Sequence, residues 1–235
     1  MKKTISFFFI LNTIFFSFFS QNINSNLIST MAINIKDVKD INIFLTYEEI
    51  EFSSIYGNEI VVDLYANNNH LLPSIDVTKD KESRGVLNIK TSTKGYSATK
   101  GDKCKIAVYI PQKVLFDNIS FLSVNPFFSL SNINAKDALI MDKGISNGNI
   151  NITNSKFSSL TVLSENSKVN IENTESEYLS IKTNSGNITL KNITSDYFDI
   201  ITKTAFVSIF LKQVPLASSN INTTDGNIEL FIPKR

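Results

Sequence analysis

One short cassette returns along the second half of the chain and limits what the chain can fold into. It reads SNGNINI at 146–152, NSGNITL at 184–190 and TDGNIEL at 224–230. The position of its glycine recurs every 19 residues and once after 21, whether or not glycine occupies it. A period near 20 residues is typical of a solenoid, in which each coil buries its apolar face against its neighbours. The residues at this position are Gly148, Ser167, Gly186, Ala205 and Gly226.

Four columns of apolar residues share this period. Polar residues separate them, so apolar and polar positions alternate in short runs, as in half-buried strands. Two short strands per period, joined by corners, fit one turn of a β-solenoid. A meander of hairpins is the alternative, because Asn-Gly and Asp-Gly favour hairpin turns, but hairpins do not require one register across successive repeats. The columns are Ile150, Val169, Ile188, Val207 and Ile228; Ile152, Ile171, Leu190, Ile209 and Leu230; Val162, Ile181, Ile200 and Ile221; and Leu160, Leu179 and Phe198.

A polar column follows the second apolar column. Asn154, Asn173 and Asn192 also recur every 19 residues. An inward asparagine at a corner can bond to backbone groups of the turn and to the asparagine of the next coil, which favours an inward asparagine ladder. Asparagine also tolerates left-handed turn conformations, so local turn chemistry is a second interpretation.

The chain is therefore predicted to be all-β, a single-stranded, right-handed parallel β-helix or β-solenoid with coils of about 19 residues. Before the regular repeat, strands are expected at 41–54, 58–66, 85–92 and 104–111. We expect residues 33–112 to form an N-terminal β cap region and residues 113–235 the solenoid repeat region. From 114 onward the coils are imperfect, with Phe128 and Leu130 in the places of Ile150 and Ile152.

The N-terminus has the pattern of an export signal. Two lysines precede an apolar segment at 5–19, which is shorter than the about 20 residues that a helix needs to cross a bilayer. The cleavage signal is weak, because Phe18 is bulky where a small residue is expected. We therefore expect residues 1–20 to be a signal peptide or an uncleaved N-terminal anchor, a linker at 21–32, and a periplasmic or cell-surface location.

Composition excludes several kinds of site. The net charge of +1 gives no general attraction to nucleic acid or to an anionic membrane. Cys104 is the only cysteine and His70 the only histidine, so neither an intramolecular disulfide nor a His/Cys zinc site can form. Cys104 lies in a strand next to two lysines, Lys103 and Lys105, and could be a thiol of low pKa, but a core-facing cysteine is favoured. We expect no cofactor, no metal and no catalytic residue.

Acidic and aromatic side chains gather near the corners of the repeat. Glu177 and Asp196 lie 19 residues apart, as do Tyr178 and Tyr197, so each pair is expected to stack on neighbouring coils. Together with Asp199, the carboxylates suggest either a calcium site or a glycosidase pair. A solvated corner with partly exposed packing tyrosines is the favoured interpretation.

Several segments carry a resemblance to a known family. They are the early strands INIFLTYEEIEFSSIYGNEIVVDL at 41–64, the strand IAVYIPQKV at 106–114 that contains a proline, and the coils LSIKTNSGNITL at 179–190 and INTTDGNIEL at 221–230. Over roughly residues 33–235 the chain resembles the bacterial exported β-solenoid domain of unknown function called "putative adhesin", of the 4097 type. Ser167 and Ala205 depart from its glycine pattern. The resemblance implies an exported β-solenoid and supplies no catalytic residues.

Two functions remain open. The first is a non-enzymatic exported protein that binds or scaffolds an unknown surface or envelope ligand, either a protein or a polysaccharide. It would not bind nucleic acid, and it would contact a membrane only through an uncleaved N-terminus. The second is a carbohydrate-active β-helix enzyme that uses Glu177, Asp196 and Asp199. The first is favoured, because the polar residues spread along corners instead of converging on one face.

Overall fold

The structure is a computed structural model that describes residues 26–46, 48–66, 74–79, 85–90, 104–124, 127–144 and 147–234. Residues 1–20, which are expected to be a signal peptide or anchor, and His70 lie outside the described residues. No helix in the described ranges is long and apolar enough to cross a bilayer.

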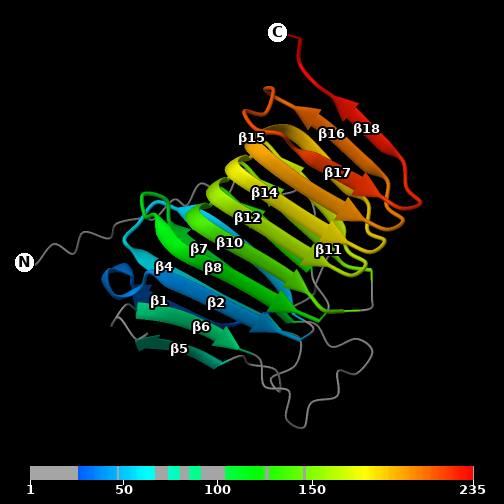
Figure 1. Cartoon of the computed structure of the whole chain (residues 1–235). Helices are drawn as coiled ribbons and strands as arrows, with labels where there is room; N and C mark the ends of the chain where they lie inside the picture. The colour runs from blue at the N-terminus through cyan, green and yellow to red at the C-terminus, as the bar shows by residue number, and fades with distance from the viewer. Residues whose placement is uncertain are drawn as a thin grey trace, which may run out of the picture.

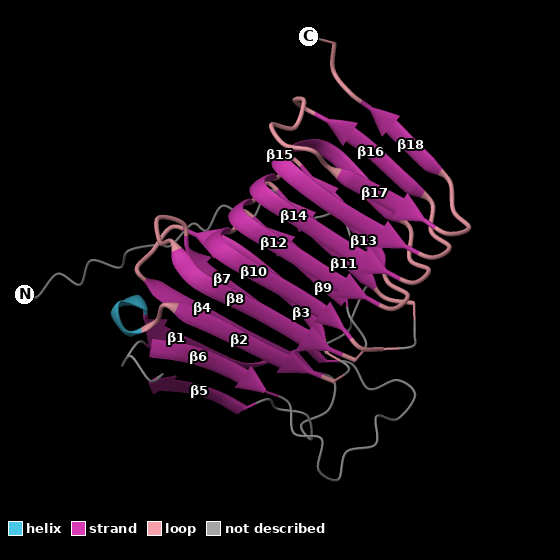
Figure 2. Cartoon of the chain, viewed as in Figure 1, coloured by secondary structure: helices cyan, strands magenta, loops and turns pink. Residues whose placement is uncertain are grey.

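The described residues form strands throughout, with one short 3-10 helix near the N-terminal end (Figure 2). The elements before the regular repeat are β1 (Asn26–Asn34), η1 (Ile35–Asp37), β2 (Asp40–Leu45), β3 (Glu49–Ile55), β4 (Glu59–Ala66), β5 (Ser74–Lys79), β6 (Gly85–Lys90) and β7 (Cys104–Pro111). Those that follow are β8 (Phe116–Ser123), β9 (Phe127–Ser131), β10 (Asn134–Asp142), β11 (Asn149–Thr153), β12 (Lys156–Ser164), β13 (Lys168–Glu172), β14 (Glu175–Thr183), β15 (Ile188–Thr202), β16 (Val207–Leu211), β17 (Asn220–Thr223) and β18 (Ile228–Phe231).

Two sheets face each other across one core, and the chain passes from one sheet to the other in every coil (Figure 1). Along the solenoid, sheet A holds β1, β4, β7, β3, β9, β11, β13, the first part of β15, β16 and β18. Sheet B holds β5, β6, β2, β8, β10, β12, β14, the second part of β15 and β17. From β8 onward every pairing is parallel, which confirms the β-solenoid.

The apolar columns are the core. Ile150 pairs with Val169, Val169 with Ile188, and Ile188 with Val207, so the column expected from the 19-residue period is confirmed. Each of these four side chains is 0% exposed. Because residues of one face recur every second position, the alternating polar residues point outward from the two sheets.

A second column consists of hydroxyl side chains that precede the corner turns of the repeat. Thr183 Oγ1 accepts a hydrogen bond from the Gly186 amide at 3.1 Å, and Ser164 Oγ accepts one from the Ser167 amide at 3.0 Å. These hydroxyls are buried at the corner, where they satisfy turn amides. Gly186 is required by close approach, since an added Cβ would lie 1.7 Å from the Ser167 carbonyl oxygen. The same column contains Asp142.

The Asp142 carboxylate is 3% exposed and is held by three donors. The Gly144 amide donates to it at 2.7 Å, Ser164 Oγ at 2.9 Å and Ser167 Oγ at 2.7 Å. A buried carboxylate is tolerated only when its oxygens are satisfied in this way. Asp142 therefore ties together the corners of two successive coils.

The N-terminal region contributes coils as well as antiparallel strands. The coil β2–β3 lies between the coil β6–β7 and the coil β8–β9, with parallel pairing on both sides. The antiparallel strands β1, β4 and β5 close this end of the solenoid. Residues 26–32, which are expected to be linker, form most of β1, because their backbone pairs with β4 along the edge of sheet A.

Candidate functional site

The tyrosines predicted from the repeat lie on the outer face of sheet B. Tyr178 in β14 pairs with Tyr197 in β15, and their rings stack with centroids 5.1 Å apart and planes 10° apart. This spacing follows from the distance of about 4.8 Å between neighbouring strands. Tyr178 is 38% exposed, so the stack is open to solvent. The expected one-coil stacking of the tyrosines is confirmed.

The predicted carboxylates lie near this stack but are bound to separate partners. Glu177 is exposed, and Ser158 Oγ donates to its Oε1 at 3.5 Å. Asp199 accepts a hydrogen bond from Asn220 Nδ2 at 2.8 Å and lies 3.9 Å from the Lys182 ammonium. Asp196 occupies the position one coil from Glu177, because the residues on either side of the two are paired. Within the described ranges, no three His, Cys, Asp or Glu side chains are grouped as metal ligands would be.

An apolar row runs along the outer face of sheet B, and sequence reasoning missed it. We call this set the apolar row: Phe44, Leu122, Met141, Leu163 and, one coil beyond Lys182, Ile201. Its members are partly exposed, with Ile201 at 37%. At the end of the row formed by Phe44, the Lys90 ammonium lies 5.5 Å from the centre of the Phe44 ring. The sequence signal was the run of apolar residues on both faces of these strands, as in ALIM at 138–141.

The outer face of sheet A is polar over the middle coils. Asn170 Nδ2 donates to Asn149 Oδ1 at 3.1 Å and to Asn151 Oδ1 at 3.0 Å. Two residues further along β13, the Glu172 carboxylate lies 3.3 Å from the Lys191 ammonium of the next coil. Over the middle coils the two outer faces therefore differ in chemistry, because amides and an ion pair lie on sheet A, whereas sheet B carries the apolar row and the tyrosine stack. Nearer the C-terminal end, sheet A also carries the stacked rings of Phe210 and Phe231.

The asparagine column combines both interpretations given from the sequence, but it does not point inward. Asn154, Asn173 and Asn192 have positive φ of 50°, 50° and 55°, and all three are exposed. Asn192 Nδ2 also donates to Asn173 Oδ1 at 3.0 Å, so part of the ladder exists. The residue after each asparagine points inward instead, as Thr174 does after Asn173. The left-handed conformation of the asparagine bends the backbone at the corner, so the following side chain faces the core. A shallow pocket lined by Asn173, Glu175, Asn192, Thr194 and Lys212 lies beside this column.

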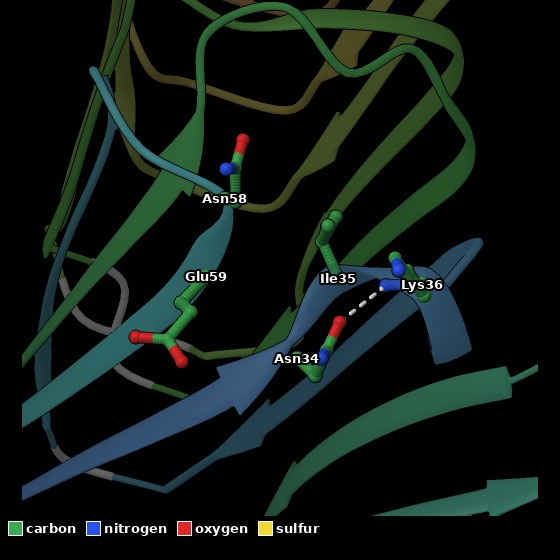
Figure 3. Close-up of a pocket in the computed structure, with 5 residues that line it drawn as sticks. All are labelled: Asn34, Ile35, Lys36, Asn58 and Glu59. Atoms are coloured by element: carbon green, nitrogen blue, oxygen red, sulfur yellow. Dashed lines mark hydrogen bonds between the residues drawn. The ribbon is translucent and has the colours of Figure 1, made fainter.

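A second pocket lies at the N-terminal end, between η1 and the start of β4 (Figure 3). Asn34 Oδ1 caps the helix by accepting from the Lys36 amide at 3.0 Å. In Figure 3 the side chains of Asn58 and Glu59 point in different directions. The pocket therefore offers separate polar contacts on its rim, with Ile35 as its apolar member.

The single cysteine faces the core, as favoured from the sequence. Cys104 is 5% exposed and packs with Ala66. Burial, with a smaller contribution from the Glu48 carboxylate, raises the pKa of the Cys104 thiol to about 12. A thiol with this pKa is protonated and unreactive at neutral pH.

Two tyrosines on the outer face of sheet A have their ionisation suppressed. Burial, followed by nearby carboxylates, raises the pKa of both Tyr65 and Tyr109 above the usual value of 10.0. Lys105 pairs with Glu51, and its ammonium lies 5.7 Å from the centre of the Tyr65 ring. These phenols are therefore neutral packing groups and not acids at physiological pH.

Because its coils stack with parallel pairing, the chain is a parallel β-solenoid protein. The chain belongs to the Toastrack DUF4097 family, whose sequence profile matches residues 28–235. Among curated proteins, none matches the chain.

Two solved bacterial structures illustrate the similarity in fold. A "putative adhesin" from Bacteroides fragilis NCTC 9343 is similar with 16% identity over 85% of this chain and 94% of its own, at a TM-score of 0.59. A "putative cell adhesion protein" from Clostridium sporogenes ATCC 15579 is similar with 11% identity over 87% of this chain and 97% of its own, at a TM-score of 0.50. At these identities the likeness establishes the fold.

Proposed function

We propose that this chain is an exported, non-enzymatic binding or scaffolding protein of the cell envelope. Its solenoid would present the outer face of sheet B to a protein or polysaccharide ligand. The observation that carries the proposal is the apolar row beside the stacked tyrosines. The names of the two similar structures, one an adhesin and the other a cell adhesion protein, agree with such a role.

The apolar row has the properties of a contact surface. Phe44, Leu122, Met141 and Leu163 stand on four neighbouring strands, so the row extends about 14 Å across the sheet before Lys182 interrupts it. Covering such side chains gains about 25 cal/mol for each Å² of apolar area removed from water. The strands are hydrogen-bonded on both sides, so binding requires little ordering of the protein.

The tyrosine stack adds a different kind of contact to the same face. Tyr178 and Tyr197 combine apolar ring surface with hydroxyl groups that can bond to a polar ligand. The combination suits a partner with both apolar and polar groups.

The enzyme alternative finds less support in the geometry. A glycosidase needs one carboxyl group that is protonated at neutral pH, which burial or a close like charge provides. Glu177 is exposed, and Asp199 lies beside Lys182 and is bonded by Asn220. Because Glu177 and Asp196 are like charges one coil apart, we expect the double change Glu177→Gln, Asp196→Asn to be neutral or mildly stabilising. A polysaccharide hydrolysis rate that this double variant abolished would favour the enzyme.

Export is tested by deleting residues 1–20 and fractionating cells of the native host. We expect the full chain in the periplasmic or surface fraction and the deleted chain in the cytoplasm. Identical distribution of the two chains would contradict the export half of the proposal.

Binding is tested with purified protein and envelope fragments of the same host. We expect Leu122→Asn with Leu163→Asn to reduce binding, because both side chains belong to the apolar row. Phe127→Asn with Phe206→Asn is the matched control, since these phenylalanines are 42% and 37% exposed but lie on the sheet A side. Equal binding by both double variants would contradict the assignment of the ligand to sheet B.

A further inference from the structure

At the C-terminal end of the described residues, sheet A has one strand more than sheet B. Beyond β15, sheet A continues with β16 and then β18, whereas sheet B continues with β17 alone. In Figure 1 β18 is the outermost strand at this end. Among the described residues, β18 therefore has no strand facing it from sheet B.

Inward-facing positions of β18 are exposed at this end. Ile228 and Leu230 pair with Val207 and Ile209, which are both 0% exposed, so all four belong to the inward columns. Ile228 is nevertheless 42% exposed and Leu230 41%. Because these apolar side chains are open to solvent, they form a surface that another apolar surface can cover.

The exposed end also has two strand edges, one in each sheet. In the described residues β17 is hydrogen-bonded only to β15, and β18 only to β16. A single extended peptide can add to one such edge. It cannot satisfy both edges and also fill the core between them.

We propose that a second copy of this chain completes the coil. The two copies are related by a two-fold axis parallel to the strands, so that β18 of each copy pairs antiparallel with β17 of the other. The protruding β18 of one copy then fills the place in sheet B that the other copy leaves empty. Such a two-fold contact is self-complementary and forms a closed dimer.

The register of this pairing follows from the corner between the two strands. Residues 224–227 reverse the chain, so Thr223 and Ile228 lie at the same end of their strands. An axis parallel to the strands keeps that alignment, and it places Ile221 of one copy opposite Leu230 of the other. Both side chains point inward, so the pair closes the core. The four residues of β17 then overlap the four residues of β18 along their whole length.

The outward side chains at this register are compatible. Asn222 of one copy faces Glu229 of the other, and the amide can donate a hydrogen bond to the carboxylate. Both residues are exposed in the single chain.

A different two-fold axis, perpendicular to the sheets, would pair β18 with β18. It would place the two β18 strands of sheet A above a gap of two strands in sheet B, because β17 of each copy lies one level further back than β18. Such a gap would leave the Ile228 and Leu230 side chains of both copies facing a void, at the cost of their packing contacts. The pairing of β18 with β17 leaves no gap and is the one we infer.

Cysteine cross-linking of the purified full chain tests the register. In the dimer, Asn222→Cys of one copy faces Glu229→Cys of the other, so the double variant should form a covalent dimer under oxidation. Within one copy the two positions point outward from opposite sheets, about 10 Å or more apart, so they cannot bridge. The natural Cys104 is buried and does not interfere. Asn134→Cys with Glu229→Cys is the control and should stay monomeric on a denaturing gel.

Analytical sedimentation measures how charge substitutions in the proposed contact change the dimer Kd. We expect the unmodified chain to sediment at twice its monomer mass. Asn222→Glu places two carboxylates opposite each other and should raise the dimer Kd by roughly tenfold or more. Adding Glu229→Lys to that variant should restore the dimer, whereas Asn134→Glu, on an exposed residue of β10 far from this end, should leave the Kd unchanged.

Three results would overturn the proposal. The first is a monomer at every concentration. The second is covalent dimer formation by Glu229→Cys alone, which would indicate β18 paired with β18. The third is a dimer that neither Asn222→Glu nor its rescue affects, which would place the contact elsewhere on the chain.

Discussion

The substitution Ile188→Ala tests the solenoid core most directly. Ile188 is 0% exposed, and its strand is paired with Val169 on one side and Val207 on the other. The change removes three carbon atoms, each worth about 0.8 kcal/mol in transfer free energy. Because the strands on both sides hold the backbone in place, the cavity cannot collapse, and the cavity term adds to the loss. We expect a destabilisation of about 3–4 kcal/mol.

Urea and thermal unfolding, followed by circular dichroism, measure this loss. For a domain of this size, about 3–4 kcal/mol corresponds to a fall in Tm of roughly 6–16 °C. Thr189→Ala is the matched control, because Thr189 is the next residue on the same strand, points outward and pairs with Asn170 and Ser208. It should change the free energy of unfolding by about 0.5 kcal/mol or less. Equal effects of the two substitutions would refute the assignment of inward and outward positions.

The other predictions concern the corners and the single thiol. Gly186→Ala should destabilise by about 2 kcal/mol or more, because its Cβ would overlap the Ser167 carbonyl oxygen; an unchanged urea midpoint would contradict the corner geometry. Asp142→Ala should cost about 3 kcal/mol or more by leaving buried donors unpaired, while Asp142→Asn should cost less, and the urea midpoints of both variants measure this. Cys104 should react with a disulfide reagent only on unfolding, because a pKa of about 12 instead of 9.0 reduces the thiolate at pH 8 by about a thousandfold. Since this pKa is raised on folding, the stability contributed by the neutral thiol is complete below pH 9.0 and should be lost as pH rises towards about 12.

The regular coils could be predicted because their columns repeat a direct physical requirement. Ile150, Val169 and Ile188 must be apolar to fill one core, and their spacing is set by the length of one coil. The corner hydroxyls were missed, although Ser164, Thr183 and Thr202 also recur every 19 residues. Serine and threonine are common in any turn, so only their common period indicated that they share one buried column.

The order of the N-terminal coils could not be predicted in the same way. Asp40 pairs with Val86 on one side and with Asn118 on the other, at separations of 86 − 40 = 46 and 118 − 40 = 78 residues. Neither separation is related to the period of the later coils. The strand segments themselves were recognisable, but a pattern along the sequence contains no information on which distant strand lies beside which.

The candidate site was hidden for a related reason. A strand with apolar residues on both faces, such as β10 with Leu139 and Met141 outward and Ile140 inward, has the sequence of a strand buried on both sides. Only the structure shows that the outer face of this strand is open. The tyrosine stack, in contrast, could be predicted, because Tyr178 and Tyr197 follow the coil period.

The solenoid separates what maintains the fold from what contacts a partner. Inward positions are constrained by the neighbouring coils, whereas outward positions such as Asn151 and Thr189 can hold polar residues at little cost to the core. Polar side chains are the default on a solvated sheet face, and partly exposed apolar side chains in a row reduce solubility without adding to the core. The apolar row is therefore not explained by folding. Its presence on sheet B is the reason for proposing that a ligand covers this face.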